Sequence, residues 1–146
     1  MRYYEDLPVG TTSEYNEATY LVTEEEIIEV GRRWDPQPFH TDPVAAAASP
    51  FGGLVASSVH LFAIAVSFGV KSDPTAAVSA LGFQELVNHA PARPGDVLRG
   101  RSTVQSRRRS NSRPGLGVMG MLVEVFNQED QLVFSFENMF LVRCRE

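Results

Sequence analysis

The chain has 146 residues, of which 13 are basic and 18 acidic, with a formal net charge of −5 and a single cysteine, Cys144. This length suits one domain and can bury a core without disulfides or metal, so we expect a single domain over residues 1–146. The negative charge argues against nucleic-acid binding through a whole face, and one cysteine excludes an internal disulfide and suits a reducing compartment.

The first predicted elements are a strand and a helix. Residues 15–22 alternate in polarity, as a strand with one covered face does. Thr23 and Glu26 form a capping box at the start of an amphipathic helix over 24–33. Residues 1–6 lack the features of a signal peptide, so we expect a cytoplasmic protein with no membrane partner.

The next segment places Asp35 and His40 five residues apart, with Pro36 and Pro38 between them. The prolines predict that this segment is not helical. Fully extended, it would separate the two side chains by roughly 17 Å, so it must curl if both act on one molecule. From these residues alone, an acid/base pair and a turn facing water are equally good interpretations.

Two helices are expected after this segment. Asp42 precedes Pro43 and the run 44–48, which predicts an N-cap role for Asp42 in preference to a catalytic one, and Ser49-Pro50 ends this short helix. The run 54–70 is apolar on nearly all sides. Because it also holds a histidine and three serines, we predict a helix buried in the core and not a membrane span.

The rest of the chain predicts four strands, joined by connections short enough to favour antiparallel pairing. They cover 77–89, 96–107, 116–127 and 131–143. The fold class is therefore α+β, with one long buried helix inside a curved antiparallel sheet.

Several other polar residues allow more than one interpretation. We expect His60 to be a core histidine with a hydrogen-bond partner, and His89 to lie at the surface. A metal site from His40, Asp42, His60 and His89 lacks a recognised ligand spacing, so no metal is expected. Arg107–Arg109 fall in a predicted turn, where they are either a solvated hairpin tip or a clamp for phosphates.

These motifs together resemble the MaoC-like acyl dehydratases, a branch of the hot-dog fold that includes the R-specific enoyl-CoA hydratases. The resemblance covers nearly the whole chain, and its specific blocks are 33–42 (RWDPQPFHTD), 49–57 (SPFGGLVAS) and 93–96 (RPGD). It implies a single hot-dog domain whose sheet wraps the long central helix, and a homodimer or a dimer of dimers.

The resemblance also implies the roles of individual residues. Asp35 and His40 would be the catalytic acid/base pair that holds a water molecule, and a backbone N–H of Ser58 or Ser57 would bind the thioester oxygen. The implied substrate contacts are Gly53, Phe39, Asn88, Arg107, Arg108 and Arg109. No cofactor is implied, because coenzyme A would be part of the substrate.

The implied activity is hydration of a trans-2-enoyl thioester to an R-3-hydroxyacyl thioester, or the reverse, in fatty acid metabolism, on coenzyme A or an acyl carrier protein. Ser58 stands where relatives usually have glycine, and Val87-Asn88 stand where they tend to have Arg-Trp. Of the properties that the resemblance implies, the identity of the substrate is therefore the one that it predicts least well. One alternative is a hot-dog thioesterase, which needs a carboxylate on or near the central helix, and 54–70 contains none. The other is a non-catalytic acyl-thioester-binding protein.

Overall fold

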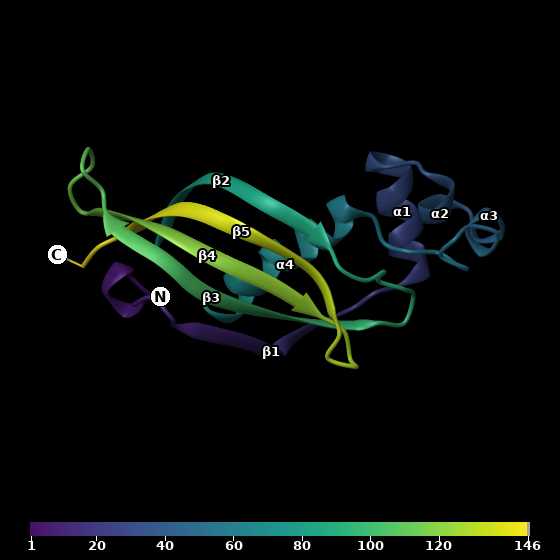
Figure 1. Cartoon of the computed structure of the whole chain (residues 1–146), viewed down its shortest axis with the longest axis horizontal. Coiled ribbons are helices and arrows are strands. Elements are labelled where there is room, and N and C mark those ends of the chain that lie inside the picture. Colours follow the sequence, from purple (N-terminus) through teal and green to yellow (C-terminus); the bar gives the residue numbers. More distant parts are fainter. Residues whose placement is uncertain (146) are drawn as a thin grey trace.

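A computed structural model describes residues 1–145 of the chain. Figure 1 shows a long curved sheet with one helix, α4, against its face and three shorter helices gathered at one end. In chain order the elements are η1 (Tyr4–Asp6), β1 (Thr12–Leu21), α1 (Glu24–Trp34), α2 (Pro38–Thr41), α3 (Pro43–Ala47), α4 (Ser58–Ser72), β2 (Ala77–Asn88), β3 (Val97–Arg109), β4 (Leu116–Phe126) and β5 (Leu132–Arg143).

The five strands form one antiparallel sheet in the order β1-β3-β4-β5-β2. Short turns join β3 to β4 and β4 to β5, as the sequence predicts, because such connections keep successive strands adjacent and antiparallel. The α+β architecture expected from the sequence is confirmed. Strands β1 and β2 are the two edges of the sheet, and β2 is exposed at almost every position.

The core lies between the sheet and α4. The helix contributes buried apolar side chains at spacings of three and four residues, which places them on one face. They are Leu61, Ile64, Ala65 and Phe68, and they pack with apolar residues of β1, β3, β4 and β5. Among the described residues, no helix combines the length and the apolar content needed to cross a bilayer.

The central helix begins four residues later than the sequence predicts. Leu54, Val55 and Ala56 are buried but belong to no helix or strand, and the N–H groups of Val55 and Ala56 donate to Phe39 O and Ala92 O. The helix starts after Ser57, whose Oγ accepts a hydrogen bond from the His60 N–H at 3.2 Å. A run of apolar residues cannot distinguish a buried non-helical segment from a buried helix, which is why the prediction was wrong here.

The helices around the Asp35 segment follow their capping residues. Thr23 accepts from the Glu26 N–H, and Asp42 Oδ1 accepts from the N–H groups of Val44 and Ala45, so both predicted N-caps are confirmed. The prediction that residues 35–40 contain no helix is wrong. Pro38 opens the one-turn helix α2, because proline at the first helical position lacks only an N–H that has no partner there anyway.

Candidate active site

The short helix α2 brings Asp35 and His40 together. Asp35 directly follows α1, and His40 lies in α2, where it is buried. His40 Nε2 is 3.4 Å from Asp35 Oδ2, so the segment curls as the sequence requires. The Asp35 side chain remains 35% exposed, and this leaves room beside the pair for a small molecule.

The other ring nitrogen of His40 is fixed by the backbone. Nδ1 lies 2.6 Å from Val55 O, and the Val55 N–H in turn donates to Phe39 O at 3.1 Å. A carbonyl oxygen can only accept, so Nδ1 carries the hydrogen and Nε2 is the nitrogen that faces Asp35. The segment before α4 thus sets both the position and the tautomer of the imidazole.

The N-terminus of α4 lies beside His40. Ser57 Oγ caps the His60 N–H, while the N–H groups of Ser58 and Val59, in the first turn, have no partner inside the helix. The helix dipole gives this end partial positive charge, which favours an oxygen that carries negative charge. Of the two predicted backbone donors, Ser58 borders the cavity described next, and Ser57 is buried as the N-cap.

A cavity of about 370 Å³ opens between α2, the start of α4 and the end of β2. His40 lines this cavity, together with two predicted substrate contacts, Phe39 and Asn88. Asn88 Nδ2 donates to Ser58 Oγ at 2.8 Å, so two of the predicted site residues contact each other. The remaining lining comes from Phe51, Val55, Ala56, Ser58, Leu61, His89, Ala90, Pro91 and Ala92.

His89 is exposed, as the sequence predicts, yet it also lines this cavity. Its Nε2 lies 2.7 Å from Ser135 Oγ, and its backbone N–H donates to Val133 O. Sequence reasoning gave His89 no role in the site. Its position directly after Asn88, at the end of a predicted strand, was the available signal.

The structure does not bring the other predicted substrate contacts to this cavity. Arg107, Arg108 and Arg109 lie within β3 and not in the turn, at the end of the sheet opposite α1, α2 and α3 (Figure 1). Arg107 and Arg109 stack on the Tyr4 ring at 4.1 and 5.2 Å, so they tie η1 to the sheet. Gly53 is also outside the lining.

His60 is a core residue, but the hydrogen-bond partner expected for it is absent from the described residues. Its Nε2 lies 3.4 Å from Glu26 Oε1 without hydrogen-bond geometry, and the Tyr20 ring packs edge-on against the imidazole. Burial lowers the pKa of His60, and the Glu26 carboxylate opposes this shift. Burial, followed by the same carboxylate, raises the pKa of Tyr20. Sequence reasoning missed Glu26 as the neighbour of His60.

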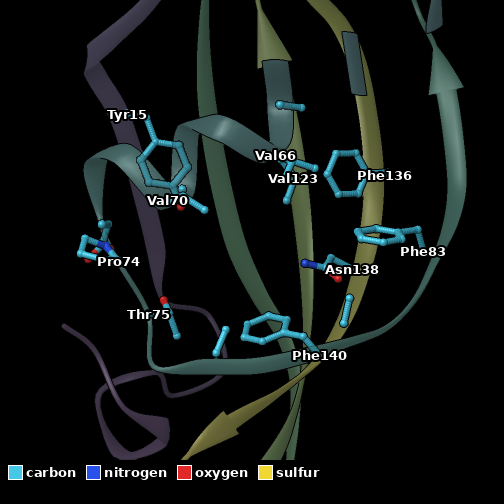
Figure 2. A pocket seen from close by; sticks show the side chains of 15 residues that line it. Tyr15, Val66, Val70, Pro74, Thr75, Phe83, Val123, Phe136, Asn138 and Phe140 are labelled. Carbon is cyan, nitrogen blue, oxygen red and sulfur yellow. The ribbon is translucent and has the colours of Figure 1, made fainter. Parts of the chain in front are cut away.

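A second cavity lies further along α4. It has a volume of about 280 Å³ and is bounded by the C-terminal half of α4 and by β2 and β5 (Figure 2). Its lining is mostly apolar, with Asn138 as a polar exception on β5. Sequence reasoning did not identify this cavity, because it depends on how far the sheet stands from the helix.

Comparison with known protein families shows to which family this chain belongs. The model of the MaoC-like domain matches residues 9–124, which is most of the chain. The chain therefore belongs to the MaoC-like dehydratase family, and its fold is the hot-dog fold. The resemblance inferred from the sequence is confirmed.

Three solved structures illustrate the relationship. The MaoC-like dehydratase from Rhodospirillum rubrum is 34% identical with a TM-score of 0.92, covering 100% of this chain and 99% of its own. The monoamine oxidase regulatory protein from Archaeoglobus fulgius is 24% identical (TM-score 0.85, 99% and 95% covered). The unliganded R-hydratase PhaJ1 from Pseudomonas aeruginosa is 23% identical (TM-score 0.76, 99% and 86% covered). The comparison with curated proteins gave no match.

Proposed function

We propose that this protein hydrates trans-2-enoyl thioesters to R-3-hydroxyacyl thioesters, or catalyses the reverse dehydration. The observation that carries the proposal is the pair formed by Asp35 Oδ2 and His40 Nε2, 3.4 Å apart, of which His40 lines the cavity and Asp35 lies outside its lining. Membership of the MaoC-like family and the likeness to an R-hydratase fold support the same reaction class. Coenzyme A or an acyl carrier protein would enter as part of the substrate.

The proposed chemistry divides two proton transfers between the pair. Ionised Asp35 takes a proton from water as its oxygen attacks C3, while protonated His40 delivers the Nε2 proton to C2. The product carries the hydroxyl on C3 and the new hydrogen on C2. Asp35 then returns its proton to Nε2, which is close enough to receive it, and the pair regains its starting state.

Negative charge develops on the thioester oxygen when water attacks. The Ser58 N–H, at the first position of the fifteen-residue helix α4, is the proposed donor to this oxygen. Loss of one such donor typically costs about 3 kcal/mol of transition-state stabilisation. The side chain of Ser58 does not remove the N–H, so the role is compatible with serine here.

The thioesterase alternative needs a carboxylate on or near the central helix. No Asp or Glu occurs within α4, from Ser58 to Ser72, but the Glu26 carboxylate lies 3.4 Å from His60 of this helix. The composition of α4 counts against the thioesterase, and the position of Glu26 keeps it as an alternative. The remaining alternative is a binding protein without activity, and an assay separates it from the hydratase.

The assay is loss of the enoyl-thioester absorbance when crotonyl-CoA is mixed with the protein. We expect turnover by the wild type, and at least about a hundredfold loss of kcat in His40→Ala and in Asp35→Asn. Asp42→Asn is the matched control, because Asp42 caps α3 and should leave turnover nearly unchanged. An inactive wild type, or full activity in Asp35→Asn, would contradict the proposed function.

A further inference from the structure

The Ser58 side chain places a hydroxyl at the cavity that His40 lines. Ser58 is exposed at the first position of α4, and the proposed reaction uses only its backbone N–H. Ser57 has a hydroxyl too, but Ser57 is buried and its Oγ caps the His60 N–H. Of the two serines at the start of α4, Ser58 is therefore the one whose hydroxyl is available to a molecule in the cavity.

Asn88 sets the direction of the Ser58 hydroxyl. Ser58 Oγ accepts a hydrogen bond from Asn88 Nδ2 at 2.8 Å, and no other hydrogen bond involves this Oγ among residues 1–145. A hydroxyl carries one hydrogen and two lone pairs, and the amide N–H occupies one of the lone pairs. The hydroxyl hydrogen must point away from Nδ2, which also presents hydrogens, so it is free to bind an acceptor in the cavity.

A bulge in β2 turns Asn88 toward α4. Glu85 and Leu86 together stand opposite Phe136 of β5, and Glu85 has a positive φ of 51°. Because side chains alternate between the two faces of a strand, one extra residue exchanges the faces of all the side chains that follow. Asn88 therefore pairs with Phe134, whose ring belongs to the core against the helix. Without the bulge, the residue before Asn88 would face α4 in its place.

The two donors of Ser58 can meet on one oxygen atom. The backbone N and the Oγ of a serine are joined through only three bonds, which holds them about 3 to 4 Å from each other. An oxygen that accepts from the N–H at the start of a helix is therefore also within reach of the hydroxyl hydrogen of the same residue. In the proposed reaction this acceptor is the thioester oxygen, on which negative charge develops.

We propose that the Ser58 hydroxyl donates a second hydrogen bond to the thioester oxygen of the substrate, and that Asn88 positions this hydroxyl. The inference rests on the proposed function, because it concerns the same oxygen that the Ser58 N–H binds there. The hydroxyl keeps its proton throughout. A hydrogen bond to an oxygen strengthens as that oxygen becomes charged, so this contact lowers the barrier to reaction more than it tightens the binding of the substrate.

Ser58→Ala tests the hydroxyl, because alanine removes the O–H and keeps the N–H. With crotonyl-CoA we expect kcat to fall by at least about tenfold and KM to change less, because the hydrogen bond is strongest when the oxygen is charged. Ser67→Ala is the matched control: Ser67 also lies in α4, but its Oγ donates to Ile64 O, so kcat should keep the wild-type value. Wild-type kcat in a folded Ser58→Ala protein would overturn the proposal.

Asn88→Asp tests the positioning role. A carboxylate can only accept, so it draws the Ser58 hydroxyl hydrogen to itself and takes it from the substrate. The substitution also adds a negative charge, and the effect of that charge alone is measured by making Asn88→Asp in the Ser58→Ala protein. We expect a larger loss of kcat when Ser58 is present than when it is absent. Equal losses in the two backgrounds would show that Asn88 does not direct the hydroxyl, and would overturn this part of the proposal.

Infrared spectroscopy of bound butyryl-CoA, a saturated thioester that cannot be hydrated, separates this inference from the proposed reaction. A hydrogen bond to a carbonyl oxygen weakens the C=O bond, so binding should lower its stretching frequency, and by less in Ser58→Ala than in the wild type or Ser67→Ala. An active wild type whose frequency shift is the same in Ser58→Ala would overturn the role of the hydroxyl alone. An inactive wild type with a shift that depends on Ser58 would overturn the reaction and leave the contact standing.

Discussion

At the scale of single residues, His60 is a buried titratable group that the proposed reaction does not use. The groups that face it are Glu26 and the aromatic ring of Tyr20, and the charge of His40 also acts on it. Desolvation disfavours the imidazolium and lowers the pKa of His60 in the folded protein. The unfolded chain has no such penalty and binds a proton near pH 6.5.

This difference makes stability depend on pH. Below about pH 6.5 the unfolded state takes up a proton that the folded state resists, so the free energy of unfolding falls as the pH falls. Above that pH both states are neutral and the contribution of His60 is constant. One proton gives a slope of at most about 1.4 kcal/mol per pH unit.

Urea unfolding from about pH 7.5 to about pH 5 measures this slope. We expect a smaller slope in His60→Leu than in the wild type, because leucine does not titrate. Glu26→Gln should steepen it, because the carboxylate that opposes the lowered pKa is removed. Identical slopes in the wild type and His60→Leu would show that other groups carry the acid sensitivity.

At the scale of elements, the contact between α1 and α2 sets the geometry of the site. Gly31 of α1 packs directly on His40, and a Cβ at Gly31 would lie 2.7 Å from His40 O and 2.9 Å from His40 Cβ. Both distances are too short for non-bonded atoms, and the oxygen belongs to the backbone. A side chain at Gly31 must therefore push α2 away from α1 and change the separation of His40 from Asp35.

Gly31→Ala should lower kcat more than it lowers affinity, by up to about a hundredfold, because misplacement by about 1 Å can have that effect on catalysis. Gly69→Ala in α4 is the control, since a Cβ at Gly69 would meet only the Tyr15 side chain, at an ordinary contact distance of 3.6 Å. Steady-state kinetics with crotonyl-CoA and a melting curve separate lost geometry from lost folding. Wild-type kcat in a well-folded Gly31→Ala protein would contradict the positioning role.

Capping residues made several elements predictable from the sequence, and apolar runs did not. Thr23 and Asp42 each fixed the start of a helix, and the structure agrees at both positions. The start of α4 was misplaced because residues 54–56 are apolar for another reason, which is burial in a non-helical segment that donates hydrogen bonds to Phe39 and Ala92. Ser57, the N-cap of α4, was the residue in the sequence that indicated the correct start of the helix.

The candidate site was predictable to the extent that it is local. Asp35 and His40 lie within one short segment, so the sequence allowed them to approach each other, although an extended segment would have kept them roughly 17 Å apart. Asn88 and Ser58 were noticed as departures from the relatives, but their hydrogen bond depends on where β2 ends beside α4. The choice between a solvated tip and a phosphate clamp for Arg107–Arg109 stays open, because a basic cluster in the sequence says nothing about which end of the sheet it occupies.

At the scale of the whole molecule, strand β2 leaves an open edge of twelve residues. Large apolar side chains on this edge are 40 to 54% exposed: Val78, Leu81, Phe83, Leu86 and Val87. A long apolar edge strand pairs readily with another chain. We therefore propose that two chains pair through their β2 strands in an antiparallel manner, which gives a closed twofold dimer and can extend to a dimer of dimers.

Such pairing has a consequence for the site. In an antiparallel pair of β2 strands, the Asn88 end of one strand lies beside the Ala77 end of the other. Asn88 lines the cavity that contains His40, so the partner would border the mouth of that cavity. Activity should then depend on assembly even though Asp35 and His40 come from one chain.

Leu81→Lys tests the dimer, because a charged lysine on an edge strand opposes pairing. Leu81 is 54% exposed, so the substitution should not disturb the core of one chain. Light scattering at micromolar concentration should show a dimer or tetramer for the wild type and a smaller species for Leu81→Lys, with a parallel fall in turnover. The concentration dependence of the melting temperature should also weaken in the variant.

Val44→Lys is the control for added charge, since Val44 lies in α3, away from β2, and is 82% exposed. It should keep the assembly and the turnover of the wild type. A wild type that is monomeric at micromolar concentration yet fully active would refute the pairing of β2 strands. A Leu81→Lys protein that is smaller but retains full turnover would show that chains do assemble through β2, and that the cavity is nevertheless complete within one chain.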